Sequence, residues 1–97
     1  MKSEEKTNRT GIRRVTFNFY APRAREVQLM GDFNKWGVKP QVMKKNNYGI
    51  WSKTTYLFPG SYEYLFLADG NWNCDPRNPN RCPNCFGTEN NVIQVKS

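Results

Sequence analysis

The sequence predicts an all-β fold, an antiparallel β-sandwich, from the spacing of its apolar and turn-forming residues. Apolar and polar residues alternate with a period of two in several short runs, as in half-buried strands. Glycine, proline, asparagine and aspartate separate these runs at short intervals, which favours antiparallel strands packed as a sandwich. No stretch sustains the 3.6-residue period of an amphipathic helix.

The first half of the chain should supply two strands, a loop and a short extended segment. Ala21-Pro22 ends the first strand and Gly31-Asp32 ends the second. The expected elements, in chain order, are a strand around Val15, Phe17 and Phe19, a strand at Val27 and Leu29, a loop containing Trp36 and Pro40, and an extended segment around Val42 and Met43.

The second half should be built around a hairpin that follows the Pro59-Gly60 turn. Asp69-Gly70 suits the positive φ angles of a tight hairpin turn, so the chain should reverse there. The expected elements are a turn at 46–49, a strand at 50–58, a hairpin strand with Tyr62, Tyr64, Phe66 and Ala68 on one face, a short return arm with Trp72, a loop at 75–85 and a closing strand at 91–95.

Length and composition indicate one small domain that is not an enzyme. The chain has 97 residues, a formal charge of +7 and no histidine. The absence of histidine removes the commonest general base and metal ligand. We expect residues 1–11 to be a disordered polar head and residues 12–97 to form the domain.

The sequence gives no indication of membrane insertion. No apolar run reaches the length needed to span a bilayer, and the N-terminal residues lack a signal-peptide pattern. A cytoplasmic location and no membrane partner are therefore expected.

The three cysteines, Cys74, Cys82 and Cys85, raise the question of a metal. Cys82 and Cys85 have the spacing of zinc knuckles and redox motifs. A structural zinc normally needs four ligands, and the chain offers three cysteines without histidine. We predict no metal and no cofactor, leaving free thiols or a local disulfide.

The three tryptophans stand in different sequence contexts, which predict different roles. Trp72 lies between Asn71 and Asn73 beside a turn, so we expect it to be displayed at the surface. Trp36 lies in a loop, where it either anchors the loop or contacts a ligand. Trp51 lies within a strand and should be core or half-buried.

Three stretches in register resemble carbohydrate-binding module family 48, which includes the glycogen-binding domain of the AMP-activated protein kinase beta subunit. They are Gly31-Asp32-Phe33-Asn34-Lys35-Trp36, the hairpin Asp69-Gly70-Asn71-Trp72 with Asp75-Pro76, and the segment from Phe86 to Val95. The resemblance covers roughly residues 12–96. It implies an immunoglobulin-like early-set sandwich that binds glycogen, starch or maltodextrin without catalysis, with a glycogen-metabolising enzyme or kinase subunit as a candidate partner.

The resemblance also implies which residues bind the sugar. An indole can cover the C–H face of a glucose ring, while amides and hydroxyls bond its edge, and two angled indoles suit a curved α-1,4 glucan. Trp36 and Trp72 match the stacking tryptophans of the family, Phe86 stands at the position of an inserted leucine, and Thr88 and Asn90 match hydrogen-bonding residues. Packing remains an alternative for Phe86, and either Asn90 or Asn91 serves only the backbone.

One position departs from the kinase-type pattern. Leu65 replaces the lysine of the Tyr-Lys-Phe strand, so a ligand-facing donor is missing. Lys35 and Lys53 are the candidates to replace it.

Three other functions are open to a basic β-domain. Asp69 and Asp75 look like a glycosidase carboxylate pair, although their Asp-Gly and Asp-Pro contexts explain them as turn residues. The domain could instead be a protein-interaction module that binds no sugar, as many early-set domains do. A single-stranded nucleic-acid binder also fits the charge, but the chain lacks the aromatic signature of RNA-recognition motifs; we expect no nucleic-acid partner.

Overall fold

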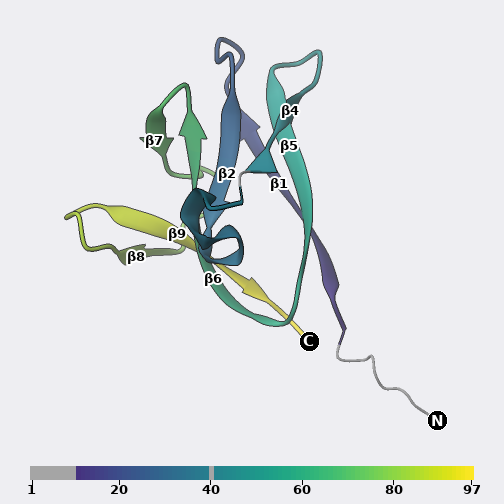
Figure 1. Ribbon diagram of the computed structural model, residues 1–97, viewed down its shortest axis with the longest axis vertical. Coiled ribbons are helices and arrows are strands. Elements are labelled where there is room, and N and C mark those ends of the chain that lie inside the picture. Colours follow the sequence, from purple (N-terminus) through teal and green to yellow (C-terminus); the bar gives the residue numbers. More distant parts are fainter. Residues whose placement is uncertain (1–10, 40) are drawn as a thin grey trace.

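The computed structural model describes residues 11–39 and 41–97, which form two antiparallel sheets packed face to face (Figure 1). Every strand pair is antiparallel, so the predicted all-β sandwich is confirmed. Of the predicted disordered head, residues 1–10 lie outside the described part, and so does Pro40 of the predicted loop.

The smaller sheet has the strand order β1-β5-β4. Its strands are β1 (Arg13–Tyr20), β5 (Ile50–Leu57) and β4 (Lys44–Lys45). β1 and β5 pair along their whole length, with Phe17 opposite Lys53 near the middle. Both strands were predicted, the first from the alternation of apolar residues and the second as the segment after the turn at 46–49.

The larger sheet has the order β3-β2-β6-β9-β8, and β7 pairs with β6 beside this path. Its strands are β2 (Val27–Gly31), β3 (Gln41–Val42), β6 (Gly60–Ala68), β7 (Asn71–Asn73), β8 (Arg81–Pro83) and β9 (Glu89–Val95). β2 pairs with one edge of β6, whereas β9 and β7 pair with successive parts of its other edge. The predicted hairpin turn is present, since Asp69 and Gly70 both have positive φ, at 48° and 81°.

Two parts of the structure differ from the prediction. The expected loop at 75–85 contains β8, which pairs with the start of β9 and so lengthens the closing strand to Glu89. Proline discourages a strand assignment, but Pro83 is tolerated because β8 is an edge strand. The loop after β2 contains a short 3₁₀ element, η1 (Asp32–Gly37), too short to leave a periodic signal.

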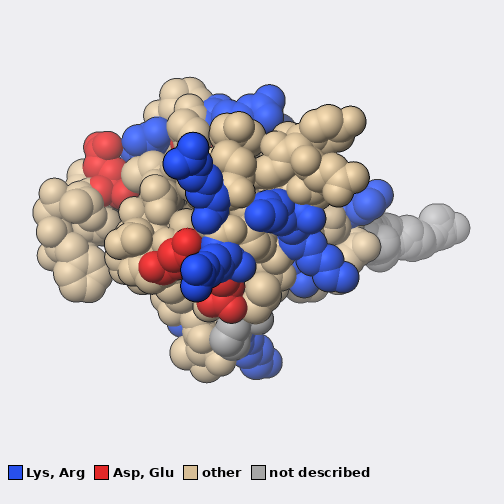
Figure 2. Space-filling model, turned by 90° about the horizontal axis from the view of Figure 1, so that it is seen from above, with Lys and Arg blue, Asp and Glu red and all other residues tan. Residues whose placement is uncertain are grey.

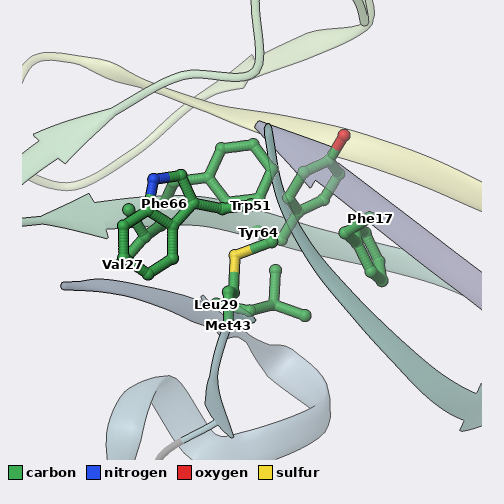
Figure 3. Packing of buried hydrophobic residues seen from close by; sticks show 7 residues of the cluster. All are labelled: Phe17, Val27, Leu29, Met43, Trp51, Tyr64 and Phe66. Atoms are coloured by element: carbon green, nitrogen blue, oxygen red, sulfur yellow. The ribbon is translucent and has the colours of Figure 1, made fainter. Parts of the chain in front are cut away.

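The core lies between the sheets and consists of seven buried side chains (Figure 3). They are Phe17, Val27, Leu29, Met43, Trp51, Tyr64 and Phe66. Met43 lies where the chain passes from β3 to β4, and thus from one sheet to the other. Trp51 is buried, as predicted, and its indole N–H donates to the carbonyl of Ala21 at 2.8 Å.

The alternation within β6 decides which side chains face away from the core. Tyr64 and Phe66 point into the core. Glu63, Leu65 and Leu67 therefore belong to the opposite, outer face of the larger sheet. This outer face carries the candidate site.

No helix within residues 11–39 and 41–97 has the length and apolar character needed to cross a membrane.

Candidate functional site

Trp36 and Trp72 lie against each other on the outer face of the larger sheet. Their ring centroids are 6.4 Å apart, and the ring planes meet at 63°. Trp72 stands opposite Leu67 in the β6–β7 register and is 55% exposed. The structure thus brings together two predicted site residues from separate elements and confirms that Trp72 is displayed.

The backbone that carries Trp36 has an unfavourable conformation. Lys35 and Trp36 have φ angles of 51° and 54°, in the left-handed region. Such angles cost about 1–3 kcal/mol for a residue other than glycine, and they persist only when the surroundings enforce them. The next residue, Gly37, also has positive φ, at 103°, and a Cβ there would meet the side chain of Met30 at 2.6 Å.

Asn34 is the residue that holds this turn. Its side chain is buried, and its Oδ1 accepts from the backbone N–H groups of Gly31 at 3.0 Å and Gly37 at 3.3 Å. Its Nδ2 donates to the carbonyl of Leu29 at 2.7 Å. The turn is therefore fixed to the end of β2 from inside.

Asp32 ties the indole of Trp36 to the central strand. Its Oδ1 accepts from the indole N–H of Trp36 at 3.1 Å, and its Oδ2 accepts from the backbone N–H of Glu63 at 2.8 Å. One carboxylate thus bridges η1 and β6. The indole N–H of Trp36 is consequently occupied by the protein.

Asn84 organises the loop between β8 and β9. Its Oδ1 accepts from the backbone N–H groups of Phe86 and Thr88 at 3.0 and 3.1 Å, and its Nδ2 donates to the Thr88 hydroxyl at 2.8 Å. The loop displays Phe86, whose side chain is 85% exposed, and leaves Thr88 exposed. Phe86 is therefore not a core packing residue.

Asn90 connects this loop to the centre of the sheet. Its Nδ2 donates to Glu63 Oε1 at 3.0 Å, and its Oδ1 accepts from Asn84 Nδ2 at 3.0 Å. The side chain is 8% exposed. Because both of its polar atoms have protein partners, Asn90 joins Asn84 to Glu63 and leaves little surface for a ligand.

Asn91 is the asparagine that serves the backbone. It is fully buried, its Oδ1 accepts from the backbone N–H of Asp75 at 2.6 Å, and its Nδ2 donates to the carbonyl of Asn78 at 3.0 Å. The expectation that one of the two neighbouring asparagines holds only backbone groups is confirmed for Asn91.

Asp32, Glu63 and Asn84 belong to this surface and were missed from the sequence. Asx-turn chemistry gave a signal for Asn84, since asparagine at the start of a loop bonds the backbone two residues on. Asp32 and Glu63 are 31 residues apart, and only the pairing of the strands brings them together.

Leu65 is part of the packing beneath the surface. It is 7% exposed and stands opposite Met30, which is 8% exposed, in the β2–β6 register. Of the two lysines expected to replace the missing donor, Lys53 belongs to β5 in the other sheet. Lys35 is exposed in η1, directly before Trp36.

The two aspartates of the glycosidase alternative have structural partners. The Asp69 carboxylate accepts from the backbone N–H groups of Arg25 and Glu26 at 2.9–3.1 Å. Asp75 accepts from the Tyr64 hydroxyl at 2.8 Å and from the backbone N–H of Arg77 at 3.0 Å. Burial raises the pKa of Tyr64 well above its usual range, so this phenol stays protonated. Both aspartates are explained as turn and loop residues.

All three cysteines are free thiols in the structure. Cys82 stands opposite Asn90 in the β8–β9 register, and desolvation and the neighbouring Glu63 raise the pKa of its thiol. Within the described part of the chain, no group of three or more cysteine, aspartate or glutamate side chains is arranged to hold a metal ion.

The charged side chains do not form one continuous basic groove on the face shown in Figure 2. Lysine and arginine side chains lie in several places there, some of them beside aspartate and glutamate. A backbone-tracking nucleic-acid groove needs a continuous positive surface, and this face lacks one.

Comparison with known families and proteins gives consistent matches. Residues 14–97 match the family model described as the glycogen recognition site of AMP-activated protein kinase. The chain is 40% identical over 72 residues to 5'-AMP-activated protein kinase subunit beta-1 of Sus scrofa, covering 74% of this chain and 56% of that protein.

Two chloroplast proteins are also similar. Protein PTST homolog 2 of Arabidopsis thaliana is 40% identical over 72 residues, which is 74% of this chain and 13% of that protein. Protein FLOURY ENDOSPERM 6 of Oryza sativa is 35% identical over 82 residues, 84% of this chain and 15% of that protein. The chain therefore spans less than two thirds of the length of these relatives.

The crystal structure of maltogenic amylase from S. marinus contains a similar fold. The TM-score is 0.72 at 21% identity, over 90% of this chain and 14% of that chain. This likeness concerns the fold alone, which is the immunoglobulin-like early-set sandwich that was predicted.

Proposed function

This chain belongs to the family of the glycogen recognition site of AMP-activated protein kinase, and on that premise we propose that it binds α-1,4-linked glucans without converting them. The observation that carries the proposal is the Trp36–Trp72 pair, with ring planes at 63° on the outer face of the larger sheet. The description of the matching family as a glycogen recognition site supports the same class of ligand.

The angle between the indoles fits a ligand that curves. Successive glucose rings of an α-1,4 chain turn relative to each other, so two rings stack best on two surfaces that are not parallel. Trp72 offers an exposed face, and Trp36 offers a second face at an angle to it. Stacking of C–H groups on indoles then supplies most of the affinity.

The β8–β9 loop supplies the polar and apolar contacts beside the tryptophans. Phe86 and Thr88 are exposed on this loop, and the ring of Phe86 is free to contact a sugar. Asn90 acts mainly by holding the loop through Asn84 and Glu63. Lys35 takes the place of the lysine that Leu65 replaces.

The larger assembly belongs to the same proposal. A glycogen-metabolising enzyme or a kinase subunit remains the candidate protein partner, because one relative is a kinase subunit. A cytoplasmic location stays a prediction, and the two chloroplast relatives offer the plastid as the alternative.

Electrophoresis through a native gel that contains glycogen, with maltoheptaose titration by calorimetry, tests the binding. Glycogen should retard the wild type. Trp36→Ala and Trp72→Ala should each bind maltoheptaose about tenfold more weakly, if a sugar ring stacked on an indole contributes the roughly 1–3 kcal/mol that a stacked base does. Tyr48→Ala is the matched control, because Tyr48 is 80% exposed in the turn before β5.

Three results decide the test. Unchanged affinity in both tryptophan variants would place the site elsewhere. Unfolding of both variants would show that the indoles serve packing. Release of sugar from glycogen by the purified protein would contradict binding without catalysis.

A further inference from the structure

The strained turn that carries Trp36 points to a residue that positions its indole. Lys35 and Trp36 both have left-handed φ angles, and Asn34 fixes the backbone of the turn from the buried side. The hydrogen bonds of the Asn34 side chain go to the backbone of Gly31, Leu29 and Gly37, so they set the path of the turn and not the orientation of the ring. Orientation requires a contact to the indole itself.

We propose that Asp32 is the positioning residue of this surface, whose carboxylate sets the angle of the Trp36 indole to Trp72. Its two oxygens bond two groups from different elements, the indole N–H of Trp36 at 3.1 Å and the backbone N–H of Glu63 at 2.8 Å. Because Glu63 lies in the central strand, the two hydrogen bonds of Asp32 fix the position of the Trp36 indole relative to the sheet. The consequence for ligand affinity rests on the proposed glucan binding.

Without the hydrogen bond to Asp32, the Trp36 side chain would have other rotamers available, because the turn around it is exposed to solvent. Trp36 is half-buried, and Asp32 itself is exposed. A ligand that needs two fixed faces would then have to order Trp36 on binding, which lowers its affinity. A carboxylate in place before binding removes that requirement.

The same contact fixes how Trp36 meets its ligand. Its only hydrogen-bond donor is directed to Asp32, so the indole can offer a sugar its faces but no N–H. Trp36 therefore contacts the C–H surface of a sugar ring, and its indole N–H donates no hydrogen bond to a sugar hydroxyl. Phenylalanine at this position would keep that kind of contact, whereas alanine would not.

The test measures the arrangement of the Trp36 and Trp72 indoles directly, by circular dichroism. Two indoles 6.4 Å apart couple their electronic transitions, which produces a paired band in the circular dichroism spectrum. Trp72→Phe identifies this band by abolishing it. Asp32→Ala should weaken the band and reduce maltoheptaose affinity about three- to tenfold, while Asp32→Asn, which keeps one acceptor, should recover part of both. Glu26→Ala removes an exposed carboxylate directly before β2 and should change neither.

Thermal unfolding of each variant accompanies these measurements, so that the spectra and affinities are compared only between folded proteins. A folded Asp32→Ala variant with the band of the wild type would overturn the proposal. Because Trp36→Phe lacks the N–H that Asp32 holds, adding Asp32→Ala to that variant should cost no further affinity, and a further loss there would also overturn the proposal. If the wild type binds no glucan, the proposed function fails, and the band in Asp32→Ala still decides whether Asp32 positions the indole.

Discussion

Replacing Asn84 with alanine removes the side chain that gives the β8–β9 loop its shape. Asn84 Oδ1 accepts from two backbone N–H groups, those of Phe86 and Thr88, and Nδ2 donates to Thr88 Oγ1 and to Asn90 Oδ1. Two backbone bonds remain in the variant, from Asn84 N to the Thr88 carbonyl at 2.9 Å and from Gly87 N to the Asn84 carbonyl at 3.4 Å. The loop should keep its ends and lose its internal support.

The magnitude follows from where these bonds lie. A hydrogen bond contributes about 0.5–1.5 kcal/mol net, and Phe86 and Thr88 are exposed, so water replaces much of what is lost there. The bond to Asn90 is different, because Asn90 is 8% exposed and its Oδ1 loses its partner. We expect the variant to be less stable by about 2 kcal/mol, a fall of roughly 8–16 °C in the unfolding midpoint for a domain of this size.

Differential scanning calorimetry and maltoheptaose titration form the assay. Asn84→Asp keeps an acceptor for Phe86 and Thr88 but cannot donate to Asn90, so it should lie between alanine and wild type in stability. Asn47→Ala, an exposed asparagine in the turn before β5, is the control. Affinity should fall severalfold in Asn84→Ala if Phe86 and Thr88 contact the glucan. Wild-type stability and affinity in Asn84→Ala would refute the assigned role of the loop network.

Three further predictions follow from other parts of the molecule. Tyr64→Phe should cost about 1–3 kcal/mol in chemical denaturation, because the buried Asp75 carboxylate loses a donor. Burial raises the pKa of Tyr64 above its unfolded value of about 10, so the contribution of the protonated phenol to stability is complete below pH 10 and is lost as the pH rises further. The free energy of unfolding should therefore fall less steeply above pH 10 in Tyr64→Phe than in the wild type. At pH 8, iodoacetamide should alkylate exposed Cys85 before Cys82, whose thiol pKa is raised, and mass spectrometry of timed samples would show the order. Glucan affinity should change little between 50 and 200 mM salt, in the range where nucleic-acid affinity would collapse, so a steep fall would favour the nucleic-acid alternative.

The strands could be predicted because their signal is local. Val15, Phe17 and Phe19 alternate with polar residues, and the structure places them in β1 beside β5. The Asp69-Gly70 turn was likewise predictable, since few residues tolerate its positive φ angles. The strand β8 was missed because its three residues gain their extended form by pairing with β9 and carry little preference of their own.

The tryptophan pair was predictable in part. A tryptophan between two asparagines indicated that Trp72 is displayed, and the structure exposes it. Nothing in the spacing from 36 to 72 states that the rings meet at 6.4 Å, because this depends on η1 folding back over the outer face of the sheet. The family resemblance supplied the pairing as an expectation, and the fold supplies its geometry.

The difference at Leu65 shows how a sequence comparison and a structure complement each other. Compared with the kinase-type pattern, Leu65 indicated only that a donor was lost. In the structure Leu65 stands opposite Met30, and Met30 lies under Gly37 of the turn that carries Trp36. A leucine here therefore supports the turn from below, at a position where a lysine would have to extend its ammonium group past η1 to reach solvent. The loss of the donor and the support of Trp36 are two effects of one residue, and under the proposed glucan binding they should act on affinity in opposite directions.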